Sequence, residues 1–199
     1  KTLGANYTVD GDTVIINGIE NIQQSEEKIF NCRESGSTLR FIIPLLLLSD
    51  VKQILTGKGR LIERPQDVYE DICKEQNLLF EKNDKITVRG RITAGNYYVK
   101  GNISSQFITG LLFALSTLQK DSRIFIEPPL ESRSYIEMTI SAMDLFGVHI
   151  EWLDDFVLYI KGGQKYSCQE LTVEGDYSGT AFLDSFNVIG GQVEVAGLN

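Results

Sequence analysis

The chain has 199 residues, 42% of them hydrophobic, and a mean hydropathy of -0.08, so it is long enough for one large or two small globular domains. Its formal net charge of -8 argues against a nucleic-acid partner, because binding to a phosphate backbone depends on clustered lysine and arginine. The longest apolar run, Phe41 to Leu48, is too short to span a membrane, so we expect no membrane partner either.

The three cysteines, Cys32, Cys73 and Cys168, lie far apart and in none of the spacings typical of metal sites. We interpret them as reduced thiols, which favours the cytoplasm, and we expect no metal and no cofactor. The chain begins at Lys1 with neither an initiator methionine nor a targeting segment, so we expect a piece of a longer protein.

The first half of the chain predicts a hairpin followed by a βαβαββ unit. Asp10-Gly11 is a strong hairpin signal between strands 5–9 and 13–16. Gly36, at a strand-to-helix turn, lacks a Cβ and would let a ligand approach the backbone. The elements expected within residues 27–92 are, in order, strand 28–32, helix 37–48, strand 51–55, helix 65–76 and strands 78–81 and 86–89.

The second half repeats this order. The elements expected within residues 95–163 are strand 97–103, helix 105–118, strand 123–127, helix 134–146 and strands 148–153 and 156–161. A third copy begins with strand 170–174, helix 178–189 and strand 192–196. The copies lie about 70 residues apart, which suits a unit of several elements. We therefore predict an α/β (α+β) fold of repeated βαβαββ units, with mixed sheets around buried helices.

The same repeat sets the expected domain organisation. Residues 1–18 match the end of an earlier unit that lies upstream of this chain. Residues 1–174 would then form a partial N-terminal, substrate-binding domain. Residues 175–199 would be the start of a second domain or a crossover segment.

The most informative stretch is 99–107. A strand runs into Ser104, Ser105 and Gln106, and then an apolar helix begins, whose first backbone N–H groups have no partner within the helix. Two hydroxyls and a carboxamide beside those groups could hold a phosphate, helped by the positive end of the helix dipole. The alternative is that Ser104 only caps the helix, since serine is a common cap.

Five motifs occur in a fixed order: Glu-Ser-Gly-Ser-Thr-Leu-Arg at 34–40, Glu-Arg-Pro at 63–65, Ser-Ser-Gln-Phe at 104–107, Ser132 with Tyr135, and Val-Glu-Gly-Asp at 173–176. Together they closely resemble the 5-enolpyruvylshikimate-3-phosphate synthase family. The resemblance implies the inside-out α/β barrel of the enolpyruvyl transferases. It also implies transfer of the enolpyruvyl group of phosphoenolpyruvate to the 5-hydroxyl of shikimate 3-phosphate, with release of phosphate, in aromatic amino acid biosynthesis.

The resemblance implies that shikimate 3-phosphate is bound by Ser104, Ser105, Gln106, Ser132 and Tyr135. Ser105 and Ser132 occupy equivalent strand-to-helix turns of one repeat, so two helix starts could converge on one dianion. Without the resemblance, Ser132 could equally be a helix cap, and Tyr135 could be a packing residue.

For phosphoenolpyruvate, the resemblance implies binding by Gly36, Arg64 and Gln106. Arg64 is the most telling of the three, because a planar guanidinium can bind a carboxylate or phosphate by two parallel hydrogen bonds. Arg40 also matches a family arginine. We expect Arg40 and Glu34 to contact the ligand-binding residues and not the ligand itself.

The first motif departs from the family pattern. Arg33 and Glu34 stand where the family commonly has Gly-Asn, and Ser37 stands where it commonly has threonine. A carboxylate at position 34 would repel an anionic substrate unless it were paired, and Arg33 or Arg40 is the expected partner.

The resemblance implies no catalytic residue within residues 1–199, because the family's N-terminal lysine and its acidic, histidine and arginine residues fall outside them. The one histidine, His149, begins a predicted strand and is interpreted as structural. We therefore expect a monomer that binds shikimate 3-phosphate without turnover. Its expected partners are shikimate 3-phosphate, phosphoenolpyruvate and the remainder of the same polypeptide.

Two alternatives stay open. The chain could be a non-catalytic anion-binding or interaction module. It could also be part of a UDP-N-acetylglucosamine enolpyruvyl transferase, which shares the fold. That family typically carries a cysteine in the loop corresponding to 57–64, and this loop has none.

Overall fold

The computed structural model describes residues 1–20, 22 and 26–198 of the chain. These residues divide into two compact units, Lys1–Ser167 and Cys168–Asn199. The larger unit begins with the predicted hairpin, in which β1 (Asn6–Asp10) pairs antiparallel with β2 (Thr13–Asn17). All ten residues of these two strands are exposed.

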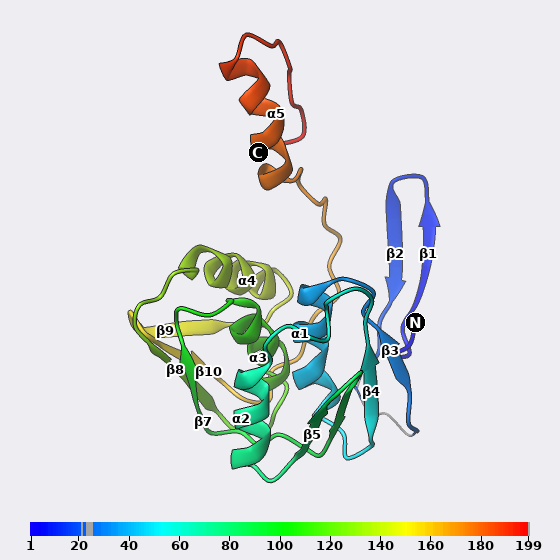
Figure 1. Cartoon of the computed structure of the whole chain (residues 1–199), viewed down its shortest axis with the longest axis vertical. Coiled ribbons are helices and arrows are strands. Elements are labelled where there is room, and N and C mark those ends of the chain that lie inside the picture. The colour runs from blue at the N-terminus through cyan, green and yellow to red at the C-terminus, as the bar shows by residue number, and fades with distance from the viewer. Residues whose placement is uncertain (21, 23–25, 199) are drawn as a thin grey trace. The chain divides into compact units, whose positions relative to one another are not determined.

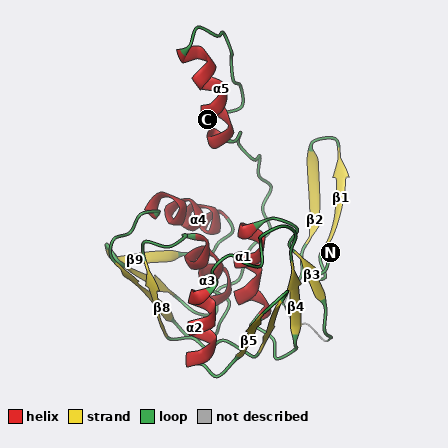
Figure 2. Cartoon of the chain, viewed as in Figure 1, coloured by secondary structure: helices red, strands yellow, loops and turns green. Residues whose placement is uncertain are grey.

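Two βαβαββ units follow the hairpin, and the predicted order of elements is confirmed in both (Figures 1 and 2). The first consists of β3 (Ile29–Asn31), α1 (Gly36–Leu46), β4 (Gln53–Thr56), α2 (Asp67–Glu75), β5 (Leu79–Lys82) and β6 (Ile86–Arg89). The second consists of β7 (Asn96–Lys100), α3 (Gln106–Leu115), β8 (Ser122–Glu127), α4 (Arg133–Leu145), β9 (Ile150–Asp154) and β10 (Val157–Ile160).

Each unit forms a four-stranded mixed sheet of the same topology, in the orders β3-β4-β6-β5 and β7-β8-β10-β9. The pairs β3/β4 and β7/β8 are parallel, and the remaining pairs are antiparallel. Because a parallel pair ends at one edge of its sheet, the segments after β3 and β4 leave the sheet together. The same holds for the segments after β7 and β8.

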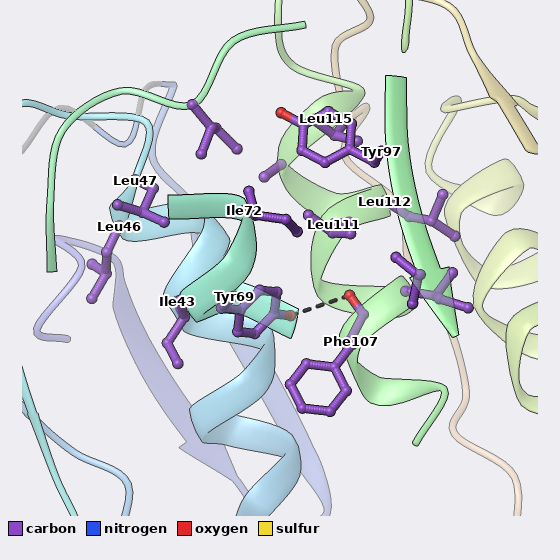
Figure 3. Close-up of a cluster of buried hydrophobic side chains, with 14 of the residues drawn as sticks. Ile43, Leu46, Leu47, Tyr69, Ile72, Tyr97, Phe107, Leu111, Leu112 and Leu115 are labelled. Carbon is purple, nitrogen blue, oxygen red and sulfur yellow. Dashed lines mark hydrogen bonds between the residues drawn. The ribbon is translucent and has the colours of Figure 1, made fainter. Parts of the chain in front are cut away.

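The helices α1 and α3 pack against each other between the two sheets (Figure 1). Eight of the ten residues of α3 are buried, as expected for a helix that is apolar nearly all round. Figure 3 shows side chains of α1, α2 and α3 meeting in this core, which includes Ile43, Leu46, Ile72, Leu111 and Leu112. The predicted mixed sheets around buried helices are thus confirmed.

The smaller unit contains α5 (Tyr177–Val188), which confirms the predicted helix 178–189. The strands predicted at 170–174 and 192–196 are wrong, because neither segment has strand structure. A strand needs a ladder of main-chain hydrogen bonds to a neighbour, and these segments find no partner strand among the described residues. The domain boundary predicted at residue 174 stays a prediction.

The strand predicted at 97–103 is shorter and ends at Lys100. The chain turns at Gly101, whose N–H donates to the carbonyl of Glu127 and whose carbonyl accepts from the N–H of Glu131. In the described part of the chain, no helix combines the length and the apolar character that crossing a bilayer requires.

Candidate functional site

The start of α1 lies beside the loop that carries Arg64. Ser35 is the N-cap of α1, and its hydroxyl accepts a hydrogen bond from the N–H of Thr38 at 3.1 Å. The turn before it is tied to the loop after β4, because the N–H of Lys58 donates to the carbonyl of Arg33. Arg33 has a φ of 51°, in the left-handed region that favours glycine. The structure therefore explains why the related family commonly has glycine at this position.

Gly36, Arg64 and Gln106, which the resemblance assigns to one ligand, converge in space. A Cβ at Gly36 would lie 2.7 Å from Nη1 of Arg64 and 3.6 Å from Oε1 of Gln106. Only glycine lets the guanidinium of Arg64 approach the backbone this closely, whereas the carboxamide of Gln106 lies at an ordinary contact distance. The three residues come from the start of α1, the loop after β4 and the start of α3.

The carboxamide of Gln106 is held from two sides by residues of α1. Nη1 of Arg40 donates to Oε1 of Gln106 at 2.9 Å, and Nε2 of Gln106 donates to the hydroxyl of Ser37 at 2.9 Å. Nη2 of Arg40 also donates to the carbonyl of Pro65 at 3.3 Å. Arg40 thus links Gln106 to the residue that follows Arg64, as a residue behind the ligand-binding positions would.

Positive charge gathers at this point. Burial lowers the pKa of Arg40, nearby Tyr69 raises it, and the positive charge of Arg64 lowers it further. Among the described residues, neither Arg40 nor Arg64 forms a salt bridge with a carboxylate. Two neighbouring guanidinium groups without a carboxylate partner favour the binding of an anion.

The ion pair expected for Glu34 is wrong. No salt bridge joins Glu34 to Arg33 or Arg40 in the part of the chain that the structure describes. The physical reason is that Arg40 stacks on the ring of Phe107, with 4.5 Å between the guanidinium carbon and the ring centroid, and its Nη1 and Nη2 atoms donate to Gln106 on α3 and to the carbonyl of Pro65. Oε1 of Glu34 instead faces Gly59 in the loop after β4, 3.5 Å from where a Cβ would stand.

The starts of α3 and α4 leave the same edge of the second sheet. Gly101, after β7, forms hydrogen bonds with Glu127 at the end of β8 and with Glu131 just before α4. A Cβ at Gly101 would lie 2.6 Å from the carbonyl oxygen of Pro129, so the two turns are in close contact. Ser104 and Ser132 each lie within three residues of these contacts, so the close contact between the two turns brings the two serines to the same edge of the sheet.

Two of the three serines near these helix starts make no side-chain cap. Ser105 and Ser132 are the N-cap residues of α3 and α4, yet neither hydroxyl forms a capping hydrogen bond. The hydroxyl of Ser104 lies 3.4 Å from the N–H of Gln106, longer than the usual 2.7–3.2 Å of such bonds. The capping alternative therefore holds for Ser104 only through this long bond and is not supported for Ser132, and the hydroxyls of Ser105 and Ser132 form no cap that would compete with a ligand.

Tyr135 lies in the first turn of α4 and is 57% exposed, which argues against a packing role. Its carbonyl accepts from the hydroxyl of Thr139, which is also 2.8 Å from the hydroxyl of Thr109 on α3. This chain of contacts ties the first turns of the two helices together. His149 is exposed and pairs with Asp144, consistent with a structural role.

Sequence reasoning missed Tyr69, whose buried hydroxyl contacts main-chain carbonyls of both α1 and α3. A signal was present, because Pro44 stands four residues after Arg40 and has no N–H. The carbonyl of Arg40 therefore needs a donor from elsewhere in the fold. Among the described residues, no group of three or more histidine, cysteine, aspartate or glutamate side chains is placed to hold a metal ion.

The whole chain is similar to proteins of one known family. Residues 1–199 match the family described as EPSP synthase (3-phosphoshikimate 1-carboxyvinyltransferase). The chain is 42% identical over 202 residues to the 3-phosphoshikimate 1-carboxyvinyltransferase of Clostridium perfringens strain SM101, covering 100% of this chain and 48% of the relative. It is 38% identical over 178 residues to the enzyme of that name from Brachyspira hyodysenteriae, covering 89% of this chain and 42% of the relative.

Solved structures agree on the fold. The EPSP synthase from Acinetobacter baumannii superposes with a TM-score of 0.68 at 14% identity, over 91% of this chain and 41% of that one. At this identity the likeness shows the fold alone. The chain spans about half the length of the curated relatives it matches, 48% in the Clostridium perfringens case.

Proposed function

Because the chain belongs to the EPSP synthase family, we propose that it forms the part of a 3-phosphoshikimate 1-carboxyvinyltransferase that binds shikimate 3-phosphate and contributes to the phosphoenolpyruvate site. The complete enzyme would transfer the enolpyruvyl group of phosphoenolpyruvate to the 5-hydroxyl of shikimate 3-phosphate and release phosphate. The observation that carries the proposal is the convergence of Gly36, Arg64 and Gln106 from three separate segments.

Shikimate 3-phosphate would bind where α3 and α4 begin. Its phosphate would accept hydrogen bonds from the hydroxyls of Ser104, Ser105 and Ser132 and from the free main-chain N–H groups of the two helix starts. Each helix start favours a bound anion by about 0.3–1 kcal/mol. The exposed ring of Tyr135 would lie against the shikimate ring.

Phosphoenolpyruvate would bind between the starts of α1 and α3. Arg64 can bind one of its anionic groups by two parallel hydrogen bonds. The Nε2 atom of Gln106 carries two N–H donors and uses one on Ser37, so the second can reach the ligand. Because Gly36 has no Cβ, the guanidinium of Arg64 has room beside the backbone of the helix start.

Turnover would need groups from the remainder of the same polypeptide. Addition of the 5-hydroxyl to C2 of phosphoenolpyruvate requires removal of the hydroxyl proton and protonation of the methylene carbon. Elimination of phosphate then requires removal of a proton from the methyl group so formed, which restores the carbon–carbon double bond. The chain's own residues would bind and orient the two substrates. The free thiols of Cys32, Cys73 and Cys168 support a reducing compartment, and we place the protein in the cytoplasm.

Calorimetric titration of the chain tests the phosphate site. We expect shikimate 3-phosphate to bind at least tenfold more tightly than shikimate, because only the former carries the dianion. Ser105→Ala and Ser132→Ala should each weaken binding severalfold, while Ser178→Ala at the start of α5 should not. Equal binding of shikimate and its phosphate would contradict the proposal, and equal binding of inorganic phosphate would favour a general anion-binding module.

A second experiment tests the whole reaction. The chain is supplied with the remaining part of a relative's polypeptide, and phosphate release from the two substrates is measured. We expect release only when both parts and both substrates are present. Binding of both substrates without any release would favour the non-catalytic alternative.

A further inference from the structure

Tyr69 is a buried tyrosine at the junction of three helices. It lies on α2 and is 1% exposed. Its hydroxyl donates to the carbonyl of Arg40 on α1 at 2.7 Å. The hydroxyl also lies 3.1 Å from the carbonyl of Phe107 on α3, the contact marked by the dashed line in Figure 3. A hydroxyl has only one proton to donate, so the two carbonyls share this donor, and the shorter hydrogen bond, to Arg40, is the stronger one.

The sequence of α1 explains why the hydroxyl is needed. In an α-helix the carbonyl of residue 40 accepts from the N–H of residue 44. Residue 44 is a buried proline inside α1, so that donor does not exist. The hydroxyl of Tyr69 supplies the missing donor, and the carbonyl of Arg40 is satisfied from a neighbouring helix.

The packing around the hydroxyl depends on a glycine. A Cβ at Gly110 of α3 would lie 2.5 Å from the carbonyl oxygen of Arg40 and would also meet the Tyr69 hydroxyl. Because Gly110 has no side chain, α3 can approach α1 at this level. The Tyr69 ring packs edge-on against the Phe107 ring, with 5.1 Å between centroids.

We propose that Tyr69 is a positioning residue for the phosphoenolpyruvate half of the site, an inference that rests on the function proposed above. Its hydroxyl fixes the backbone of Arg40, whose side chain holds the carboxamide of Gln106 and the carbonyl of Pro65. Its second contact fixes Phe107, the residue after Gln106. One hydroxyl thus sets the distance between the helix starts that present Gln106 and Gly36 to the ligand.

The test compares Tyr69→Phe with a matched control, Tyr97→Phe, in the full 199-residue chain. Tyr97 is also buried, 3% exposed, and its hydroxyl is hydrogen-bonded to Thr93 and Gln76, away from the helix starts. The first readout needs no ligand: the side-chain amide resonance of Gln106 in ¹H–¹⁵N spectra. It should move in Tyr69→Phe and stay in place in Tyr97→Phe.

The second readout is binding. In Tyr69→Phe, phosphoenolpyruvate should bind about tenfold more weakly in the presence of saturating shikimate 3-phosphate, the loss expected for about 1.4 kcal/mol. The affinity for shikimate 3-phosphate itself should stay within about twofold, a margin of only a few tenths of a kcal/mol. Tyr97→Phe should change neither affinity.

Two results would overturn the positioning role. One is an unmoved Gln106 amide with unchanged binding of phosphoenolpyruvate. The other is an equal loss of affinity for both ligands in Tyr69→Phe, or the same loss of affinity in Tyr97→Phe. Either result indicates that the substitution destabilises the fold as a whole and does not act on the phosphoenolpyruvate site. If the parent chain binds neither substrate, the proposed function fails, and the Gln106 resonance alone then decides whether Tyr69 positions this side chain.

Discussion

Replacing Gly36 by alanine tests the geometry of the phosphoenolpyruvate site with one methyl group. The new Cβ would stand 2.7 Å from Nη1 of Arg64, closer than side-chain carbons come, so the guanidinium must move. A displaced guanidinium loses at least one charge-assisted hydrogen bond to the ligand, worth about 1.5–3 kcal/mol. We therefore expect phosphoenolpyruvate to bind about 10- to 150-fold more weakly.

Folding should not suffer. The backbone of Gly36 lies outside the left-handed region, and the group that must yield is the end of a flexible side chain. Alanine is also at least as good a helix former as glycine, so the substitution loses no helix propensity at the first residue of α1. The melting temperature should therefore stay level or rise while phosphoenolpyruvate binding falls and shikimate 3-phosphate binding holds.

The assay is calorimetric titration of both ligands, with thermal unfolding of the same samples. Gly18→Ala is the matched control, because a Cβ there meets nothing within 4 Å. Unchanged phosphoenolpyruvate binding in Gly36→Ala would refute the reasoning that Arg64 and Gly36 share a ligand. A parallel loss of stability would refute the claim that only the guanidinium has to move.

Three further outcomes are expected. Tyr69→Phe should lower the free energy of unfolding by about 1–3 kcal/mol in denaturant titrations, because it leaves a buried carbonyl unpaired; no loss would contradict this. Arg33→Gly should raise it by about 0.5–1 kcal/mol, because φ is 51° at that position, and a fall would show that the turn favours arginine. Burial raises the pKa of Cys32 to about 11 and the pKa of Cys73 to about 12. At pH 8 a thiol-specific disulfide reagent should therefore modify only the exposed Cys168 while the chain is folded. Rapid labelling of all three cysteines would contradict this.

The fold follows from the sequence wherever local and tertiary preferences agree. Apolar runs, glycine-bearing turns and a repeated order of elements predict both βαβαββ units correctly. The strands predicted at 170–174 and 192–196 fail because β structure depends on a partner strand, which periodicity within one segment does not report. Helix 178–189 succeeds because its hydrogen bonds are internal.

The candidate site could be predicted only in part. Motif resemblance names Gly36, Arg64 and Gln106, but their convergence depends on how α1 and α3 pack, which spacing does not show. The partner of Arg40 was predicted wrongly, because charge alone suggested Glu34 whereas burial against Phe107 turns the guanidinium toward α3. Long-range contacts of this kind are a property of packing, and sequence patterns report mainly local structure.

The most direct test of the phosphate site is a ¹H–¹⁵N titration of the chain with shikimate 3-phosphate, followed residue by residue. The account predicts that the largest shifts occur at the main-chain N–H groups of Ser105, Gln106 and Ser134, where α3 and α4 begin. Unmoved resonances at these two helix starts, with shifts concentrated elsewhere or absent at saturating ligand, would contradict it.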